Sequence, residues 1–542
     1  MPDSAAGTPA SASGSDHPLV EQVRAGYTFE GPALELGGLM LDAETLADAR
    51  VRIPLGMLNR HGLVAGATGT GKTKTLQLLA EQLSAHGVPV FAPDIKGDLS
   101  GLSAPGKTDD KITARAASVG QQWTPAAHPV EYYAIGGKGT GIPLRATMSS
   151  FGPTLLAKVL GLNDTQESSL GLVFHYADKA GLPLLDLSDL RAVVQFLVSD
   201  EGKDELKQLG GLAASTAGVI LRELITFGDQ GADAFFGEPE LDTADLLRVT
   251  DDGRGVISLV ELPDLQDRPA VFSTFLMWLL ADLFHDLPEV GDPEKPRLVF
   301  FFDEAHLLFK DASKDFLAAI TQTVRLIRSK GVGVFFVTQS PTDVPEDVLA
   351  QLGSRVQHQL RAHTPNEAKA LRATVDTYPT SGYDDLGEVL TMLGIGEAVV
   401  TVMSERGAPT PVAWTKLRAP ESLMGPATPE SMTAAVVGSP LQGKYVAPVD
   451  RESAREILAE RLEQGAAKAR REQEAAEAAG ADKLGYPDAD GGTGARKRSK
   501  PAKRSEKDES VVSQVLQSSA GQQFMRTAAR EIARGLFKVG RR

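Results

Sequence analysis

Short continuous apolar runs alternate along the chain with stretches whose apolar residues recur every three to four positions. Continuous runs are typical of strands buried on both faces, and the three-to-four spacing is typical of helices with one buried face. The expected strands are Leu63–Ala65, Val88–Ala92, Val130–Ile135, Gly255–Val260, Leu298–Phe302 and Val332–Val337. Amphipathic helices fall between strands, beginning with Lys72–Ala85. This alternation predicts an α/β fold with a mostly parallel sheet covered on both faces.

Three flanking segments extend this sheet in the prediction. Residues 32–54 carry short apolar stretches that we expect to form a small β lead-in. Val356–Arg361 and Glu397–Met403 are expected to complete the sheet.

Between residues 150 and 250 strands are scarce and apolar residues keep helical spacing, which predicts a helical insertion. Its expected helices are Leu155–Leu162, Gln166–Ala180, Leu187–Val198 and Ala213–Phe227.

The predicted organisation has five parts. They are a disordered N-terminus (1–30), the first part of the α/β core (31–150), the helical insertion (151–250), the second part of the core (251–420) and a C-terminal extension (421–542). The extension contains an exposed helix or coiled coil (451–479), a basic linker with the sequence RKRSKPAKR and a terminal amphipathic helix (524–537). A solvated linker and a contact with nucleic acid or an acidic partner both remain open for the basic run.

Composition narrows the classes of function. The chain has no cysteine, which excludes disulfides and cysteine-ligated zinc or iron–sulfur sites. It contains no long uncharged apolar run and no signal-peptide pattern, so we expect a cytoplasmic protein with no membrane partner. The formal net charge of −15 opposes nucleic-acid binding in general, although a ring can hide a basic channel inside an acidic exterior.

The strongest chemical signal is the sequence GATGTGKT, which matches the Walker A pattern GxxxxGK[ST]. It follows an expected strand and opens an expected helix, a context that favours a phosphate-binding loop over a fortuitous glycine-rich turn. Lys72 is expected to reach the β- and γ-phosphates of ATP, and Thr73 to ligate Mg²⁺. The predicted nucleotide-binding residues are Gly66, Ala67, Thr68, Gly69, Thr70, Gly71, Lys72, Thr73 and Lys74.

Two carboxylates follow the apolar run LVFFF, as in a Walker B motif. We expect Asp303 to hold Mg²⁺ through water and Glu304 to orient and deprotonate the water that attacks the γ-phosphate. The alternative is a pair of carboxylates that cap the next helix. The sequence DEAH also allows a superfamily-two helicase, but those enzymes pair two similar lobes and one core is visible in this chain.

Further polar residues stand near the expected strand ends. Gln339 follows the strand after the carboxylates, where it can sense the γ-phosphate or simply end the strand. Such a strand marks ATPases with an added strand between the phosphate loop and the carboxylate. Asp94, in the sequence DIKGD, lies near the expected nucleotide or in a polar turn. Arg328 and Arg355, like Arg325, are candidates for an arginine finger that acts on a neighbouring subunit, or are solvated or salt-bridged side chains.

Together these motifs resemble the HerA/FtsK superfamily of P-loop ATPases, and most closely the bacterial HerA-like proteins of the YjgR type, which have a helicase HerA-like C-terminal domain. The likeness is carried by NRHGLVAGATGTGKT, GVPVFAPDIKGDLSGL, KPRLVFFFDEAHLLF, VRLIRSKGVGVFFVTQSPTDVP and LGSRVQHQLRAHTP. The resemblance implies a RecA-like core, and a hexameric ring with ATP sites between subunits. It maps Gln339 to the sensor and Arg355 to the trans-acting arginine, with Arg328 as the alternative.

The function expected from this resemblance is a ring-forming ATPase that uses ATP and Mg²⁺ to move along or unwind DNA. The alternative is an ATP-driven remodelling or assembly factor for proteins, which recruits an unknown partner through its C-terminal extension. A third reading, an inactive nucleotide-binding scaffold, is disfavoured because every expected catalytic residue type is present.

Overall fold

The computed structural model describes residues 17–136, 139–207, 210–262, 269–309, 314–449 and 451–482. The chain divides into two compact units, Met1–Ala469 and Arg470–Arg542. In the second unit the described residues form the end of the exposed helix α17 (Ala454–Asp482), which confirms the helix predicted there. The predicted basic linker and terminal helix lie outside the described residues.

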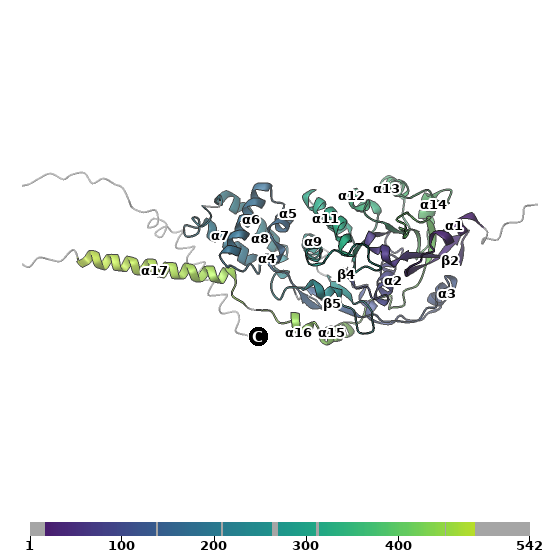
Figure 1. Ribbon diagram of the computed structural model, residues 1–542, viewed down its shortest axis with the longest axis horizontal. Helices are drawn as coiled ribbons and strands as arrows, with labels where there is room; N and C mark the ends of the chain where they lie inside the picture. Colours follow the sequence, from purple (N-terminus) through teal and green to yellow (C-terminus); the bar gives the residue numbers. More distant parts are fainter. Residues whose placement is uncertain are drawn as a thin grey trace, which may run out of the picture. The chain divides into compact units, whose positions relative to one another are not determined.

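The centre of the first unit is a mixed sheet, in which the described residues form twelve strands (Figure 1). The strand order is β2-β1-β12-β11-β10-β3-β9-β8-β4-β7-β5-β6. Neighbours from β10 to β6 are parallel, and neighbours from β2 to β10 are antiparallel. The strands are β1 (Ala33–Leu41), β2 (Glu44–Pro54), β3 (Gly62–Ala65), β4 (Val90–Asp94), β5 (Val130–Ile135), β6 (Ile142–Leu144), β7 (Ile257–Glu261), β8 (Leu298–Phe302), β9 (Val332–Thr338), β10 (Ser354–Gln357), β11 (Glu397–Thr401) and β12 (Ala413–Leu417).

The sheet confirms the predicted α/β class. All six strands expected from continuous apolar runs are present, and β5 and β8 have the predicted bounds. Strands β1 and β2 are the expected lead-in, and β10 and β11 complete the sheet. The sequence pattern does not predict β12, because a buried polar residue, Thr415, occupies the middle of this short strand.

Helices cover both faces of the sheet, and alternate residues of one strand show how. Phe300 and Phe302 of β8 pack in one hydrophobic core with helix α9 (Pro269–Asp286) and helix α11 (Lys314–Ile327). Phe301 packs in the other core with helix α2 (Lys72–Ala85). Because successive side chains of a strand point to opposite faces, a run of five apolar residues is what a strand between two helical layers requires.

The helical insertion is confirmed, and its helices gather in one cluster (Figure 1). Its helices are α4 (Met148–Phe151), α5 (Pro153–Val159), α6 (Asp164–Lys179), α7 (Leu187–Val198) and α8 (Ala214–Asp229). Helix α6 begins with a capping box between Asn163 and Gln166. The apolar faces of the insertion and of α9 share one core, in which Phe235 packs edge-on against Trp278. The insertion therefore packs on the helical layer that covers one face of the sheet.

The prediction of a disordered N-terminus is wrong for part of residues 1–30, because residues 18–26 form helix α1 (Pro18–Gly26). The side chain of His17 caps this helix, and Leu19, Val20 and Val23 are buried. These residues give the segment an apolar face that packs on the β1–β2 hairpin core. The other described helices are α3 (Asp110–Ser118), α10 (His306–Phe309), α12 (Glu346–Leu349), α13 (Pro365–Val375), α14 (Leu386–Met392), α15 (Pro429–Gly438) and α16 (Gln442–Tyr445).

The beginning of the predicted C-terminal extension packs on the core. The backbone N–H groups of Glu421 and Ser422 donate to the carboxylate of Glu81 on α2, at 2.9 and 3.2 Å. The hydroxyl of Tyr445 accepts a hydrogen bond from the Asp242 N–H at 2.9 Å. None of the described helices is both long enough and apolar enough to cross a bilayer.

Candidate active site

The phosphate loop connects β3 to α2 and packs closely against His358, the residue that follows β10. Gly66 has a φ of +155°, and a Cβ placed on it would lie 2.4 Å from the Cβ of His358. His358 is fully buried, and its Nε2 lies 2.9 Å from the Thr75 hydroxyl of α2. Burial lowers the pKa of His358 to about 4, so the ring packs under the loop in its neutral form. Position 66 therefore has room only for a glycine next to this histidine.

Lys72 closes the loop from its concave side. Its Nζ donates to the carbonyls of Gly66 at 2.7 Å and Ala67 at 3.2 Å. Burial lowers the pKa of Lys72, against the opposing charges of Glu304 and Asp303. Helix α2 starts at Lys72 with no side-chain cap on its first N–H groups. These N–H groups, the positive end of the helix dipole and the Lys72 ammonium together favour an anion at the start of α2.

The carboxylates lie at the carboxyl end of β8. Asp303 and Glu304 are both buried, and the Glu304 N–H donates to Asp303 Oδ1 at 2.9 Å. Burial, together with the neighbouring Glu304, raises the pKa of Asp303 to about 6. The backbone of Glu304 has a φ of +50°, a left-handed conformation that is costly for a residue with a side chain. Such local strain is common where a catalytic side chain must be aimed.

Lys96, from the sequence DIKGD, binds the Glu304 carboxylate through Oε1. Burial alone would raise the pKa of Glu304, but the hydrogen bond and charge of Lys96 outweigh it and lower this pKa. The other oxygen, Oε2, is buried and lies 3.3 Å from Nδ1 of His306, without the alignment of a hydrogen bond. The pairing favours the ionised form of Glu304 and leaves its Oε2 without a hydrogen bond among the described residues. The sequence analysis did not predict a role for Lys96. In the sequence DIKGD it singled out Asp94, the residue at the end of the strand.

Asp94 itself has a structural role. Its carboxylate accepts hydrogen bonds from the N–H groups of Leu99 at 2.9 Å and Ser100 at 3.2 Å. Burial raises the pKa of Asp94 in spite of these bonds. The polar-turn interpretation of Asp94 is therefore what the contacts support.

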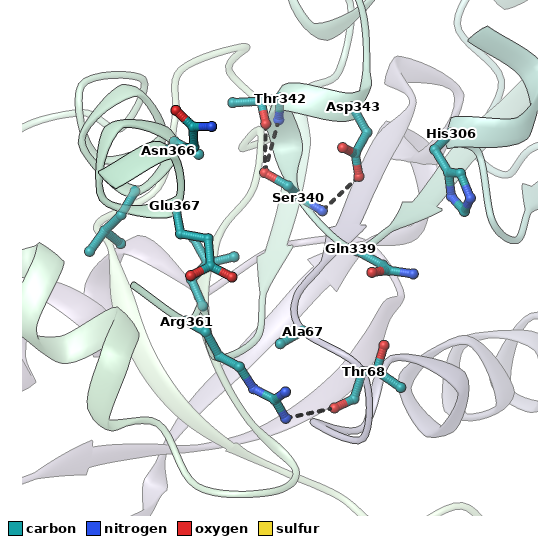
Figure 2. A pocket seen from close by; sticks show the side chains of 13 residues that line it. Ala67, Thr68, His306, Gln339, Ser340, Thr342, Asp343, Arg361, Asn366 and Glu367 are labelled. Atoms are coloured by element: carbon teal, nitrogen blue, oxygen red, sulfur yellow. Dashed lines mark hydrogen bonds between the residues drawn. The ribbon is translucent and has the colours of Figure 1, made fainter. Parts of the chain in front are cut away.

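Gln339 follows β9, and β9 lies between the strand of the phosphate loop and the strand of the carboxylates. This order confirms the added strand inferred from the sequence. Gln339 lines a cavity of about 550 Å³ together with Ala67 and Thr68 of the loop (Figure 2). Asp343 holds the turn after it, accepting hydrogen bonds from the Thr338 hydroxyl and the Ser340 N–H. The loop, the carboxylates and Gln339 thus share the carboxyl edge of the parallel strands.

The far wall of this cavity comes from α13 and from the segment after β10. Figure 2 shows Arg361 reaching toward the loop, where its Nη2 donates to the Thr68 carbonyl at 3.3 Å. Asn366 and Glu367 of α13 complete this wall. Arg361 was missed at the sequence level because its distance from the loop along the chain hides the contact.

The candidate finger arginines lie elsewhere. Arg328 lies just before β9, at the amino ends of the parallel strands, whereas the loop lies at their carboxyl ends. Its Nη2 is 3.7 Å from Oδ1 of Asp292. Arg60 binds the same Asp292 oxygen at 2.9 Å. Arg355 pairs in register with Leu63 within the sheet, and its Nη1 donates to the carbonyl and hydroxyl of Thr377. The structure therefore does not bring either arginine to this chain's own phosphate loop.

The residues at the carboxyl edge fit a magnesium ion bound with a triphosphate. Mg²⁺ takes oxygen ligands and commonly uses one or two protein groups beside the phosphates. Thr73 and Asp303 supply a hydroxyl and a carboxylate, and Asp303 is buried beside a second carboxylate, Glu304, a setting that favours a cation. Held there by Thr73 and Asp303, the ion would neutralise the negative charge that develops on the phosphates.

A phosphate loop, an acidic pair and a glutamine on an intervening strand are the defining parts of a P-loop ATPase with a RecA-like core. The geometry above places all of them on one edge of one sheet. The chain belongs to the helicase HerA-like C-terminal family, whose model matches residues 40–542. The resemblance to the HerA/FtsK superfamily is thereby confirmed.

Two curated relatives carry the name DNA double-strand break repair helicase HerA. The protein from Saccharolobus solfataricus is 22% identical over 390 residues, covering 70% of this chain and 68% of its own length. The protein from Sulfolobus acidocaldarius is 22% identical over 359 residues, covering 65% of this chain and 64% of its own length.

Solved structures are similar at lower identity. The bacterial conjugative coupling protein TrwBdeltaN70 has a TM-score of 0.49 and 16% identity, covering 75% of this chain and 94% of that one. VirB4 of Thermoanaerobacter pseudethanolicus has a TM-score of 0.44 and 15% identity, covering 74% of this chain and 99% of that one.

Proposed function

We propose that this protein is a ring-forming ATPase that hydrolyses ATP with Mg²⁺ and couples the hydrolysis to translocation along DNA or to its unwinding. The observation that carries the hydrolytic part is the buried Glu304, held ionised by Lys96 at the edge where the phosphate loop ends. A carboxylate that is merely structural does not need a strained backbone and a dedicated ammonium partner at a nucleotide site.

In this mechanism the phosphates and the attacking water are bound by different residues. Lys72 and the first N–H groups of α2 bind the β- and γ-phosphates, and Gln339 contacts the γ-phosphate from the strand between loop and carboxylates. Lys96 occupies Oε1 of Glu304, so Oε2 is the oxygen that accepts a hydrogen bond and then a proton from the attacking water. Thr73 and Asp303 would hold the magnesium ion.

The ring is proposed because neither candidate finger arginine, Arg328 or Arg355, lies at the phosphate loop of its own chain. Between the two candidates, the geometry favours Arg328. Arg355 is engaged by two hydrogen bonds to Thr377 and lies over the ring of Tyr378, whereas Arg328 is 41% exposed with a 3.7 Å pair to an exposed aspartate. An arginine that completes a neighbour's site has to be free to leave its own subunit's surface.

Arg328→Ala is expected to retain ATP binding and to lose turnover by about 10³-fold or more, as removal of a finger arginine does. Mixing Arg328→Ala subunits with Lys72→Ala subunits should restore part of the activity, because some interfaces then combine an intact loop with an intact finger. Phosphate release in mixtures of the two variants measures this. If Lys72→Ala subunits regain activity when mixed with Arg355→Ala subunits but not when mixed with Arg328→Ala subunits, the arginine finger is Arg355. If neither mixture regains activity, a trans-acting arginine is contradicted.

The DNA part of the proposal is supported by the family and by the name of the curated relatives, which are DNA repair helicases. We expect the ATPase rate to rise several-fold when single- or double-stranded DNA is added at low salt, and to fall back as salt increases, because phosphate contacts are lost to counterions. Steady-state phosphate release with and without DNA measures this. A rate unchanged by either form of DNA would contradict DNA translocation.

The same assay tests the alternative, an ATPase that acts on a protein partner. Helix α17 favours this alternative, because its side chains from Arg461 to Ala476 are largely exposed and Leu462 is among them. A chain that ends at Ala469 is the suitable comparison, since Ala454 and Leu458 at the start of α17 are buried in the core. An ATPase rate that does not respond to DNA, and that is the same in the full chain and in the chain that ends at Ala469, would favour the protein-remodelling function.

A further inference from the structure

His306, the first residue of α10, lies between the Glu304 carboxylate and the cavity of Figure 2. It follows Glu304 by two positions, and its side chain lines this cavity together with Gln339 (Figure 2). The side chain is 33% exposed, so one part of the ring faces the protein and another part faces open space. The mechanism proposed above gives a role to both carboxylates of the sequence DEAH but none to this histidine.

Two buried atoms face each other at this place without a hydrogen bond. Oε2 of Glu304 and Nδ1 of His306 are 3.3 Å apart, and neither has a hydrogen-bond partner among the described residues. The other oxygen of the carboxylate, Oε1, is bound by Lys96. The oxygen that has to take a proton from the attacking water is therefore buried against the histidine ring.

This arrangement conflicts with the chemistry that Glu304 has to perform. A general base must lie within about 2.6–3.2 Å of the group whose proton it takes, or reach it through one water. A water molecule can make this contact only with an oxygen that it can touch, and Oε2 is buried. Glu304 therefore cannot activate water while the His306 ring stays in this position.

The ring has room to leave, and the contact that holds it is weak. The pair of Nδ1 and Oε2 lacks the alignment of a hydrogen bond, and leaving two buried polar atoms unpaired costs free energy. On its other side the ring borders the cavity of about 550 Å³, which is large enough to accept an imidazole. A change of the side-chain rotamer of His306 can therefore uncover Oε2.

We propose that His306 is a positioning residue that covers Oε2 of Glu304 and holds ATP turnover low until its ring turns into the cavity. The ring and the attacking water compete for the same oxygen. Once the ring has turned away, Oε2 opens toward the cavity that Gln339 and the phosphate loop line. The inference rests on the proposed function, because it concerns the regulation of the same hydrolytic site.

His306→Ala should raise the kcat of ATP turnover about tenfold or more in the absence of DNA. The reason is that an uncovered arrangement that is the minor state of the wild type is populated to about 10% or less. The KM of ATP should stay within about twofold of the wild-type value, because the variant leaves the phosphate loop unchanged. Steady-state phosphate release by the full chain with magnesium measures both constants.

Three further variants separate the cover from other effects. His306→Ser removes the ring in the same way and should give the same rise. His306→Phe keeps a ring over Oε2 and should leave turnover at or below the wild-type rate. His175→Ala is the matched control, because His175 is exposed on α6 in the helical insertion, and it should change neither constant.

The additional turnover must pass through Glu304. Adding Glu304→Gln to His306→Ala should therefore abolish the rise and give the low rate of Glu304→Gln alone. A kcat in His306→Ala and His306→Ser that is equal to or below the wild-type value, with an unchanged melting temperature, would overturn the inference. A rise that persists in the double variant, or that His306→Phe shows equally, would also overturn it. If neither the wild type nor His306→Ala hydrolyses ATP, the proposed function itself fails, which is a different result from each of these.

Discussion

Glu304→Gln is expected to lower the rate of ATP turnover by about 10²–10⁴-fold while the Kd of ATP changes little, since general-base catalysis contributes on that scale. Glutamine keeps an oxygen that can accept the hydrogen bond of Lys96, so the side chain remains in place. It cannot take a proton from water at neutral pH, and the loss therefore falls on the chemical step. Steady-state phosphate release and nucleotide titration separate the two constants.

Glu346→Gln is the matched control for this variant. Glu346 is exposed on α12 and does not line the cavity of Figure 2, so its replacement should leave turnover unchanged. Full turnover in Glu304→Gln would show that Glu304 does not activate the water. A rise in the Kd of ATP equal to the loss in turnover would assign Glu304 to binding rather than to catalysis.

Lys72→Ala should lower turnover by at least about 10²-fold, the scale of removing one preorganised donor to a developing charge, and should also raise the Kd of ATP. Two losses combine in this variant. The phosphates lose the Lys72 ammonium, and the loop loses the clamp between the carbonyls of Gly66 and Ala67. Both constants are measured as for Glu304, and the melting temperature reports whether the fold is intact.

Lys179→Ala controls for the loss of a lysine. Lys179 is exposed on α6 in the helical insertion, and its replacement is expected to change neither constant. Turnover in Lys72→Ala within a few-fold of wild type, with an unchanged melting temperature, would contradict the assignment of the phosphate loop. The pair Lys72→Ala and Glu304→Gln thus separates failure to bind ATP from failure to cleave it.

Local patterns predicted most of the core, for an identifiable physical reason. A strand buried on both faces must be apolar throughout, and LVFFF therefore indicates β8 with its bounds. A loop that must bend back on itself to surround phosphates needs glycines at fixed places, and GATGTGKT therefore indicates the phosphate site. Two segments with weaker patterns were not predicted. Helix α1 lies in the part of the N-terminus that was expected to be disordered, and β12 has a buried threonine in its middle.

The sequence by itself determined the class of fold, the phosphate loop, the acidic pair and Gln339, because each depends on a few adjacent residues with one physical requirement. Only the tertiary structure decided which distant groups complete them. Lys96 meets Glu304 across 208 positions of the chain, and Gly396 meets the loop because β11 and β12 extend the sheet beyond β10. Such contacts are set by strand order, and no local pattern of hydrophobic and polar residues encodes them.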